Sequence, residues 1–349
     1  MQLTPIFKDI LEASLLAPSA DNHHRLLFET KKDELLLWSE PGRLRDLTGY
    51  KRTLDLVSLG AVIENISLRA SAHSLEALVE LVPPDKHDLV ARIQFQSTSN
   101  DPDPLRAAIP LRHTNRRFFK GPAASPETLR SIQEEARRIS GCDIDWLDTT
   151  EQRSKALQLI RRAEGERFRN KVLHAELFEN IRFSVGWHQT CDEALPPGAL
   201  EIEPPLRFLF RTLRHWPVMR ILNFIWVYKQ LGWRAGDLPC RLSPHLGVVS
   251  TRSLTDVDQI NAGRSFQRAW LCSAAYGLAL QPMPASVLYA QHAAIGQGIP
   301  DHLQSYLHTG WEELIPEKIP LMVFRMGNAP APSIVTGRKA LDAYLIERG

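Results

Sequence analysis

The chain has 349 residues, 44% of them hydrophobic and 23% charged, which is enough for a substantial buried core in one or two domains. Its 42 Lys and Arg residues and 40 Asp and Glu residues give a formal net charge of +2, so no overall basic field indicates a nucleic-acid partner. The four cysteines form no CxxC pair, so the sequence supports neither a disulfide framework nor a thiolate zinc site.

The first hundred residues predict two helices and four strands. The helix at 4–16 ends where Ala17-Pro18 leads into the turn residues Ser19, Asp21 and Asn22. A longer helix at 53–73 carries an apolar stripe, and Gly60 lets a neighbouring element approach closely. Strands are expected at 26–28, 35–38, 75–82 and 90–95, followed by a polar, proline-rich linker at 97–104.

The remaining residues predict a second set of helices and strands. Ser125-Pro126-Glu127 opens a helix that reaches about Ser140, and residues 152–183 are mostly helical. Another long helix runs from Thr255 to Tyr276 and ends at Gly277. Strands are expected at 144–147, 248–251, 278–283 and 321–326. Residues 192–245 look irregular, proline-containing and rich in Trp and Phe.

No targeting or spanning segment is visible. The opening stretch MQLTPIFKDI lacks a basic region followed by an apolar core. The most apolar stretch, residues 216–233, is interrupted by Arg220 and Lys229 and is shorter than the about 20 clean apolar residues that a bilayer requires. We therefore expect a cytoplasmic protein with no membrane partner.

The two long helices resemble each other weakly. When the chain is shifted to superimpose Gly60 on Gly263, Leu68 coincides with Leu271 and a strand follows each helix. This pattern indicates either a degenerate internal duplication or two unrelated amphipathic helices.

Three short motifs are candidate binding elements. RHTNRRFF, residues 112–119, carries three arginines whose planar guanidinium groups suit a phosphate, or else forms a solvated basic turn. APSADN, residues 17–22, and GLALQPM, residues 277–283, each suit either a ligand contact or an ordinary loop and strand entry. His23-His24 and the pair His188 and Cys191 lack further ligands, so no metal is expected.

Taken together, these motifs resemble the nitroreductase family of FMN flavoproteins, and more closely its two-half, Acg-like members. RHTNRRF is similar to the family's RRSxRxF segment, and APSADN to its APSxxN segment. NAGRSFQRAWLCSAAYGLALQPM, residues 261–283, is similar to its central helix, and GRKALDAYL, from Gly337, to its tail. The chain departs from the pattern at residues 24–26, where His-Arg-Leu replaces Gln-Pro-Trp.

The resemblance implies a fold and a site. The fold would be α+β, a nitroreductase-like mixed sheet flanked by helices, with two degenerate halves at 1–100 and 101–349. Residues 186–245 would be a Trp-rich insertion, either a lid or a packed helical segment. One FMN would bind per chain, in a monomeric pseudo-dimer or a homodimer. The implied contacts are Arg112, Thr114, Arg116, Arg338 and Lys339 at the phosphate, Ser19 and Asn22 from the first half, and Gln281, Pro282 and Met283, with their backbone, at the ring.

The resemblance also implies an activity. An FMN-dependent oxidoreductase would take a hydride from NADH or NADPH and pass electrons to a small nitroaromatic or quinone-like acceptor. Three alternatives stay open: a protein that binds or sequesters flavin without turnover, a related flavin-destroying or dehalogenating activity, and a flavin-free scaffold. No catalytic acid–base pair can be chosen from the sequence.

Overall fold

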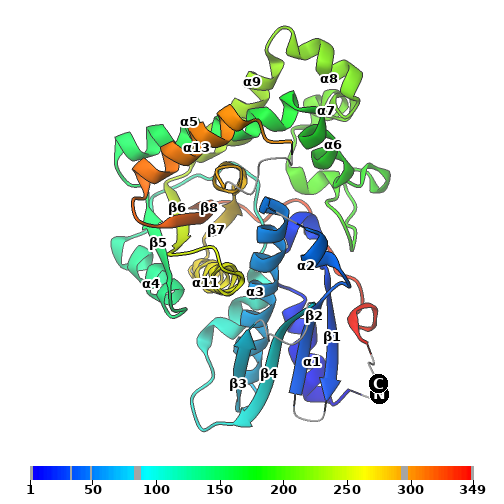
Figure 1. The fold of residues 1–349 in the computed structure, drawn as a ribbon, viewed down its shortest axis with the longest axis vertical. Helices are drawn as coiled ribbons and strands as arrows, with labels where there is room; N and C mark the ends of the chain where they lie inside the picture. The colour runs from blue at the N-terminus through cyan, green and yellow to red at the C-terminus, as the bar shows by residue number, and fades with distance from the viewer. Residues whose placement is uncertain (1–2, 32–33, 48, 82–87, 292–297, 347–349) are drawn as a thin grey trace.

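The computed structural model describes residues 3–31, 34–47, 49–81, 88–291 and 298–346. Two four-stranded sheets lie on either side of a pair of long helices, and further helices cover them (Figure 1). The ladders within both sheets are antiparallel, and single parallel bridges join other segments to them. The predicted α+β class, with sheets flanked by helices, is confirmed.

The first sheet is built from residues 26–97. Its strands are β1 (Leu26–Lys31), β2 (Glu34–Ser39), β3 (Leu75–Leu81) and β4 (Leu89–Ser97), in the order β1-β2-β4-β3. The helices are α1 (Pro5–Ser14), α2 (Arg43–Asp46) and α3 (Gly49–Ser71). Thr4 caps α1, because its side chain accepts a hydrogen bond from the Phe7 amide. Val82, where the third predicted strand ended, lies outside the described residues.

The second sheet repeats this order. Its strands are β5 (Cys142–Trp146), β6 (His245–Thr251), β7 (Ala279–Pro282) and β8 (Ile319–Gly327), in the order β5-β6-β8-β7. Helix α4 (Pro126–Arg137) precedes the sheet, as α1 precedes the first, and α11 (Asp256–Ala275) follows its second strand, as α3 does. Helices α12 (Ala285–Leu288) and α13 (Asp301–Leu314) lie between β7 and β8 and were not predicted from the sequence.

Much of the segment between β5 and β6 is helical, so the prediction of irregular structure at 192–245 is wrong for residues 207–242, whereas residues 192–206 contain only bends, an isolated bridge and short 3-10 turns, as expected. After α5 (Thr150–Arg169) and α6 (Lys171–Glu179) come α7 (Arg207–Leu213), α8 (Trp216–Asn223), α9 (Val227–Gly232), a π-helical turn (Trp233–Asp237) and α10 (Leu238–Leu242). Its prolines misled the prediction: Pro217 and Pro239 lie in the first turns of α8 and α10, where proline starts a helix and does not interrupt one.

Helices α3 and α11 cross at a pair of glycines. A Cβ on Gly60 would lie 2.0 Å from the carbonyl oxygen of Ile260, and a Cβ on Gly263 would lie 2.0 Å from that of Val57. The two backbones therefore touch, which only residues without a side chain allow. Gly60 and Gly263 are the two residues that the sequence comparison of the helices superimposes.

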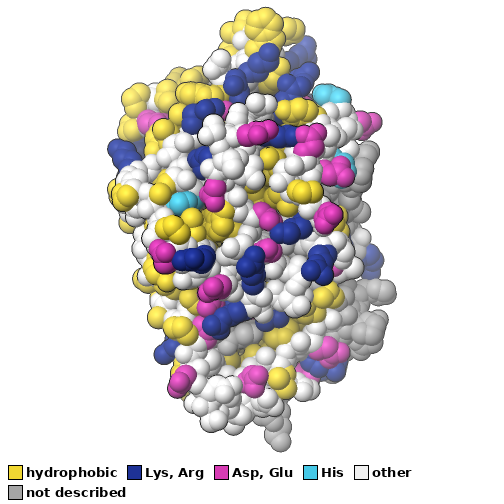
Figure 2. Space-filling model, turned by 90° about the vertical axis from the view of Figure 1, so that its left-hand side faces the viewer, with side chains coloured by type: hydrophobic (Ala, Val, Ile, Leu, Met, Phe, Trp, Pro, Cys, Tyr) yellow, Lys and Arg dark blue, Asp and Glu magenta, His cyan; other side chains and the backbone are white. Residues whose placement is uncertain are grey.

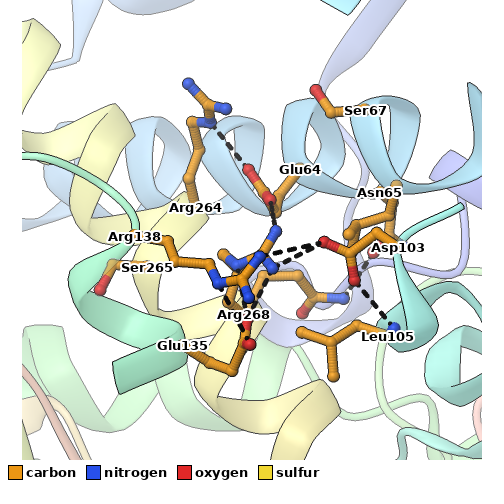
Figure 3. A network of polar contacts seen from close by, with 12 residues as sticks. Glu64, Asn65, Ser67, Asp103, Leu105, Glu135, Arg138, Arg264, Ser265 and Arg268 are labelled. Carbon is orange, nitrogen blue, oxygen red and sulfur yellow. Dashed lines mark hydrogen bonds and ion pairs between the residues drawn. The ribbon is translucent and has the colours of Figure 1, made fainter. Parts of the chain in front are cut away.

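A buried ion-pair network locks this crossing (Figure 3). Glu64 of α3 pairs with Arg264 at 2.9 Å and with Arg268 at 2.7 Å, both on α11. The Arg268 guanidinium also donates to Asp103 at 2.8 Å and to Glu135 of α4 at 2.6 Å. Because three carboxylates surround Arg268, its pKa is raised despite burial. The network joins α3, α4 and α11 to the predicted linker, to which Asp103 belongs.

The end of the chain returns to the first sheet. Leu345 forms a parallel bridge with Phe28 of β1, and the Ile346 amide donates to the Phe28 carbonyl at 2.9 Å. Residues that follow the second sheet in sequence thus pack against the first one, and the segment before them, including Arg338, crosses between the two.

The glycine contact makes a stability prediction. Gly60→Ala should lower the free energy of unfolding by about 1–3 kcal/mol or more, because the new methyl group must push α3 and α11 apart. Urea unfolding followed by circular dichroism measures this, with Ser67→Ala on the same helix as the matched control. A loss no larger than in the control would show that the crossing tolerates a side chain.

Candidate functional site

A cavity of about 590 Å³ is lined by segments associated with both sheets and by the helices between β5 and β6. It collects residues from the 17–22 turn, α3, the arginine segment, α5 and α6, the insertion, the stretch after β7 and the C-terminal segment. Of the predicted site residues it brings together all except Lys339, namely Ser19, Asn22, Arg112, Thr114, Arg116, Gln281, Pro282, Met283 and Arg338.

The 17–22 turn is fastened to α3. Asp21 and Asn22 adopt left-handed backbone conformations, with φ of 49° and 62°, which Asp and Asn tolerate better than most residues. The Ala20 amide donates to Ser58 Oγ of α3 at 3.2 Å. Asn22 is buried and holds loops together, since its Nδ2 donates to the Ala194 carbonyl at 3.2 Å. By contrast, the buried Ser19 Oγ has no partner among the described residues.

The arginine segment adds an extended piece beside β7. Thr114 bridges to Leu280, and the Asn115 amide donates to the Leu280 carbonyl at 3.1 Å. Side chains two residues apart in an extended segment share one face. Arg112, Thr114 and Arg116 therefore all face the cavity.

Arg112 is a buried cation without an anionic partner. Its guanidinium lies 4.5 Å from the centre of the Trp270 ring, and Nη2 donates to the Leu16 carbonyl at 2.9 Å. Its Nε is buried and unpartnered, and none of the described carboxylates lies within ion-pairing distance. Burial, with help from the charge of Arg338, lowers the Arg112 pKa to about 9. Such a group gains most from a ligand that brings negative charge.

Arg338 lies beside Arg112, but most of its N–H groups already donate hydrogen bonds within the protein. It donates to the Leu15 carbonyl at 2.7 Å and the Ala17 carbonyl at 3.1 Å, just beyond α1, and to the side chain of Asn22. Burial lowers its pKa to about 10. Arg338 thus places a second positive charge near Arg112 and also closes the carboxyl end of α1.

Arg116 has different charged neighbours. Its Nη1 donates to the Ala199 carbonyl at 3.2 Å, and the charges acting on it come chiefly from Asp21, Arg167 and Glu201. Burial lowers the Arg116 pKa and raises that of the Asp21 carboxyl, which accepts a hydrogen bond from Asn180 at 3.0 Å. The cavity therefore has an arginine pair at one place and a mixed cluster of both charges at another.

The stretch after Gly277 agrees only in part with the expectation that residues 281–283 and their backbone contact a ring. Gln281 is held in position, because its Oε1 accepts from Arg325 Nε at 2.8 Å. The backbone of residues 281–283 was expected to offer hydrogen bonds to the ring, but the Met283 amide instead donates to the Val323 carbonyl at 2.6 Å. The edge of β8 takes that donor, and Pro282 has none. The amide group of Gln281 and the side chains of Pro282 and Met283 are what this stretch offers the cavity.

Lys339 does not line the cavity. Its Nζ forms an ion pair with Glu193 at 2.9 Å, and its side chain is partly exposed. Neither does Arg25, whose Nη1 lies 3.5 Å from Glu40. Each of these two side chains is therefore paired with a carboxylate and does not line the cavity.

The cavity wall also carries a polar cluster that was not predicted from the sequence. Tyr50 donates to Glu176 Oε2 at 2.6 Å, and its ring lies 5.2 Å from that of Tyr289 in an edge-to-face arrangement. Arg167 donates to Glu164 at 3.2 Å. Because α5 and α6 look like ordinary charged helices in sequence, only their burial against the cavity reveals these groups.

His24 occupies the position where the family motif has another residue. It is buried beneath the turn, its Nε2 has no partner in the described structure, and its ring faces Tyr344 edge-on. Burial, reinforced by the charges of Arg338 and Arg112, holds its pKa well below the ordinary value of 6.5. In the described residues no group of three or more His, Cys, Asp and Glu side chains is arranged to hold a metal ion.

Comparison with known proteins gives distant likenesses. No family model matches the chain. The protein MT1398 of Mycobacterium tuberculosis (strain CDC 1551 / Oshkosh) is 25% identical over 360 aligned positions, which cover 97% of this chain and 48% of that protein. The chain therefore spans about half the length of the relative it matches.

Among solved structures, the chain is similar to nitroreductases, the family that its motifs resemble. A Bacteroides fragilis nitroreductase with bound FMN is 11% identical, with 68% of this chain and 95% of that one covered at a TM-score of 0.36. The FMN-dependent nitroreductase NfnB of Mycobacterium smegmatis, in complex with NADPH, is 16% identical, with coverages of 71% and 96% at a TM-score of 0.35. Likenesses this distant do not by themselves assign an activity.

The state of His24 makes a pH prediction. The folded protein keeps His24 neutral, whereas the unfolded chain takes up a proton below about pH 6.5, so stability should fall as the pH falls. Between pH 7 and 5 the free energy of unfolding should drop more steeply than in His24→Gln, by up to about 1.4 kcal/mol per pH unit.

Urea unfolding at several pH values measures this difference, with the exposed His188→Gln as control. Equal slopes in the parent protein and His24→Gln would contradict the buried, neutral histidine.

Proposed function

We propose that the chain is a two-half member of the nitroreductase family that binds FMN and acts as an oxidoreductase. The observation that carries the proposal is convergence: motifs near residues 20, 114, 282 and 338, chosen from sequence, line one cavity. A chance resemblance in separate motifs gives no reason for them to meet around a single space.

The buried donors suit a phosphate monoester. The buried Nε–H of Arg112 has no partner among the described residues, and Arg338 adds charge beside it. Thr114 lines the same cavity, and Ser19 Oγ is an unpartnered buried hydroxyl. A dianionic phosphate would receive charge-assisted hydrogen bonds here and would compensate the burial of the two cations.

The rest of the cavity suits a flat polar ring system. Gln281 offers a positioned amide, Pro282 and Met283 offer apolar surface, and Arg116 brings positive charge from the neighbouring strip of chain. Bound FMN would supply the redox chemistry, taking a hydride from NAD(P)H and passing electrons to a small nitroaromatic or quinone-like acceptor. Arg116 would then stabilise negative charge on the bound cofactor. The buried Asp21, whose pKa is raised, would hold or exchange a proton.

The site would explain why the chain has two halves. Residues 1–100 would supply the 17–22 turn, and residues 101–349 would supply the arginines and the stretch after β7. The matching strand orders and the glycine crossing support a duplication in which one composite site per chain survives. The chain would then act as a monomeric pseudo-dimer or as a homodimer of such units.

A second candidate is a protein that holds flavin without turnover. Helices of the insertion wall the cavity through Leu209, Phe210, Leu213 and Leu231, which leaves less room for a nicotinamide to reach the ring. The two functions differ in whether NAD(P)H reduces the bound cofactor.

Removing the phosphate contact should weaken the binding of FMN but not that of riboflavin. Arg112→Met should weaken FMN binding about 10–150-fold, because one charge-assisted contact contributes roughly 1.5–3 kcal/mol. Riboflavin lacks the phosphate, so its affinity should change little. Fluorescence quenching of each flavin on titration with protein measures both affinities.

Arg130→Met, at an exposed arginine of α4, is the matched control. An equal loss for FMN and riboflavin would mean that the substitution damages the cavity and not a phosphate site. No loss for either would refute the role of Arg112.

Turnover is tested by reduction. The FMN-loaded protein should lose its yellow absorbance when NADH or NADPH is added anaerobically and regain it when a quinone follows. Bound flavin that stays oxidised with both nicotinamides but bleaches with dithionite would support the flavin-holding alternative. Failure to retain stoichiometric FMN would refute both functions.

A further inference from the structure

The helical insertion exposes an apolar surface at one end of the molecule. Figure 1 places α8 and α9 at this end, and Figure 2 shows hydrophobic side chains gathered there with Lys and Arg side chains around them. Phe208 is 83% exposed and Phe224 76%, and Ile221, Ile225 and Trp226 are each more than 60% exposed. We call these five residues the apolar tip.

The opposite sides of the same helices are also apolar. Leu213 and Met219 are buried in a small core of their own with Phe168, Phe178 and Ile181. Helices that are apolar on both faces normally have both faces covered. The interior of the protein covers only one face here, so the apolar tip lacks a covering surface.

The tip is held in shape. Trp226 stands between α8 and α9 with φ of 57°, a left-handed conformation that a bulky side chain rarely adopts. Lys229 Nζ lies over its ring, 5.4 Å from the ring centre. A strained residue fixed at an exposed turn is typical of a surface that has a role.

The charges around the tip have one sign. Residues 204–236 contain no Asp or Glu but six cations, Arg207, Arg211, Arg214, Arg220, Lys229 and Arg234. Within the described part of the chain, Arg234 alone of these six makes an ion pair, with Glu203. The whole chain has a net charge of only +2, so this segment is a local concentration of positive charge.

These charges discriminate between possible occupants. In a two-fold dimer formed through the tip, the same cations of both copies would face each other. An anionic lipid surface supplies the opposite charge, while its interface accepts the exposed Trp, Phe and Ile side chains. We propose that the apolar tip and its surrounding cations dock the protein onto the surface of an anionic phospholipid bilayer.

Docking would be peripheral. Within the described ranges no helix combines the length and apolarity that crossing a bilayer requires. The proposal replaces the expectation of no membrane partner, which considered only spanning segments. It stands independently of the proposed function, although the insertion also walls the cavity and would place it near the bilayer.

Vesicle binding tests the proposal. The full chain should sediment with vesicles of phosphatidylglycerol mixed with phosphatidylcholine and bind far less to phosphatidylcholine alone, with blue-shifted tryptophan fluorescence. The double variant Phe224→Ser, Trp226→Ser should bind the mixed vesicles at least about tenfold more weakly, because it removes two inserting aromatic side chains.

Two further double variants test whether the effect is specific to the apolar tip and its cations. Leu78→Ser with Tyr306→Ser removes exposed apolar side chains elsewhere and should leave vesicle binding unchanged. Arg211→Gln with Arg220→Gln keeps the apolar tip and should lower binding to the anionic vesicles specifically. This charge variant also covers the case in which the serine variant does not fold.

Three outcomes would overturn the proposal. The first is no binding to phosphatidylglycerol vesicles at low salt. The second is equal binding to neutral and anionic vesicles, since it removes the role of the cations. The third is a dimer in sedimentation velocity that the Phe224→Ser, Trp226→Ser variant converts to a monomer, which would assign the tip to a second copy.

Discussion

The contact between α3 and α11 is the constraint on which the rest of the molecule depends. Gly60 and Gly263 let the two backbones touch, and the buried carboxylate of Glu64 pairs with Arg264 and Arg268 across the crossing. Contacts with these two helices position both walls of the cavity. Ser58 of α3 fastens the 17–22 turn, and Trp270 of α11 supports the Arg112 guanidinium. A shift of one helix along the other would separate the two parts of the site.

The network at the crossing and the arginines in the cavity show two opposite treatments of a buried cation. Arg268 is surrounded by three carboxylates, so its charge is compensated within the protein. Arg112 and Arg338 lie beside each other, and both donate to backbone carbonyl groups. Arg112 also lies over an indole ring, and no described carboxylate pairs with either residue. The first arrangement stabilises the fold, whereas the second leaves the two charges uncompensated within the described protein. Binding of the proposed FMN phosphate would therefore also stabilise the folded state.

The helical insertion joins two surfaces that are otherwise separate. One face of its helices encloses the cavity through Phe210 and Leu213, and another carries the apolar tip with Phe224 and Trp226. Glycines again allow close packing, since a Cβ on Gly232 would lie 2.7 Å from the backbone of Gly165 on α5. The insertion is thus packed closely against α5, which also lines the cavity.

The sequence by itself determined the elements whose signals are local. Apolar spacing and capping residues located α3, α4 and α11, and the motif order brought Ser19, Arg112 and Gln281 into one predicted site. Tertiary structure alone decided the partners: Lys339 pairs with Glu193, Met283 gives its N–H to Val323, and Arg116 faces Asp21 and Arg167. It also revealed the helices of the insertion and the Tyr50–Glu176 cluster. Periodicity and caps act within a few residues, whereas burial and pairing depend on segments that meet only in the folded chain.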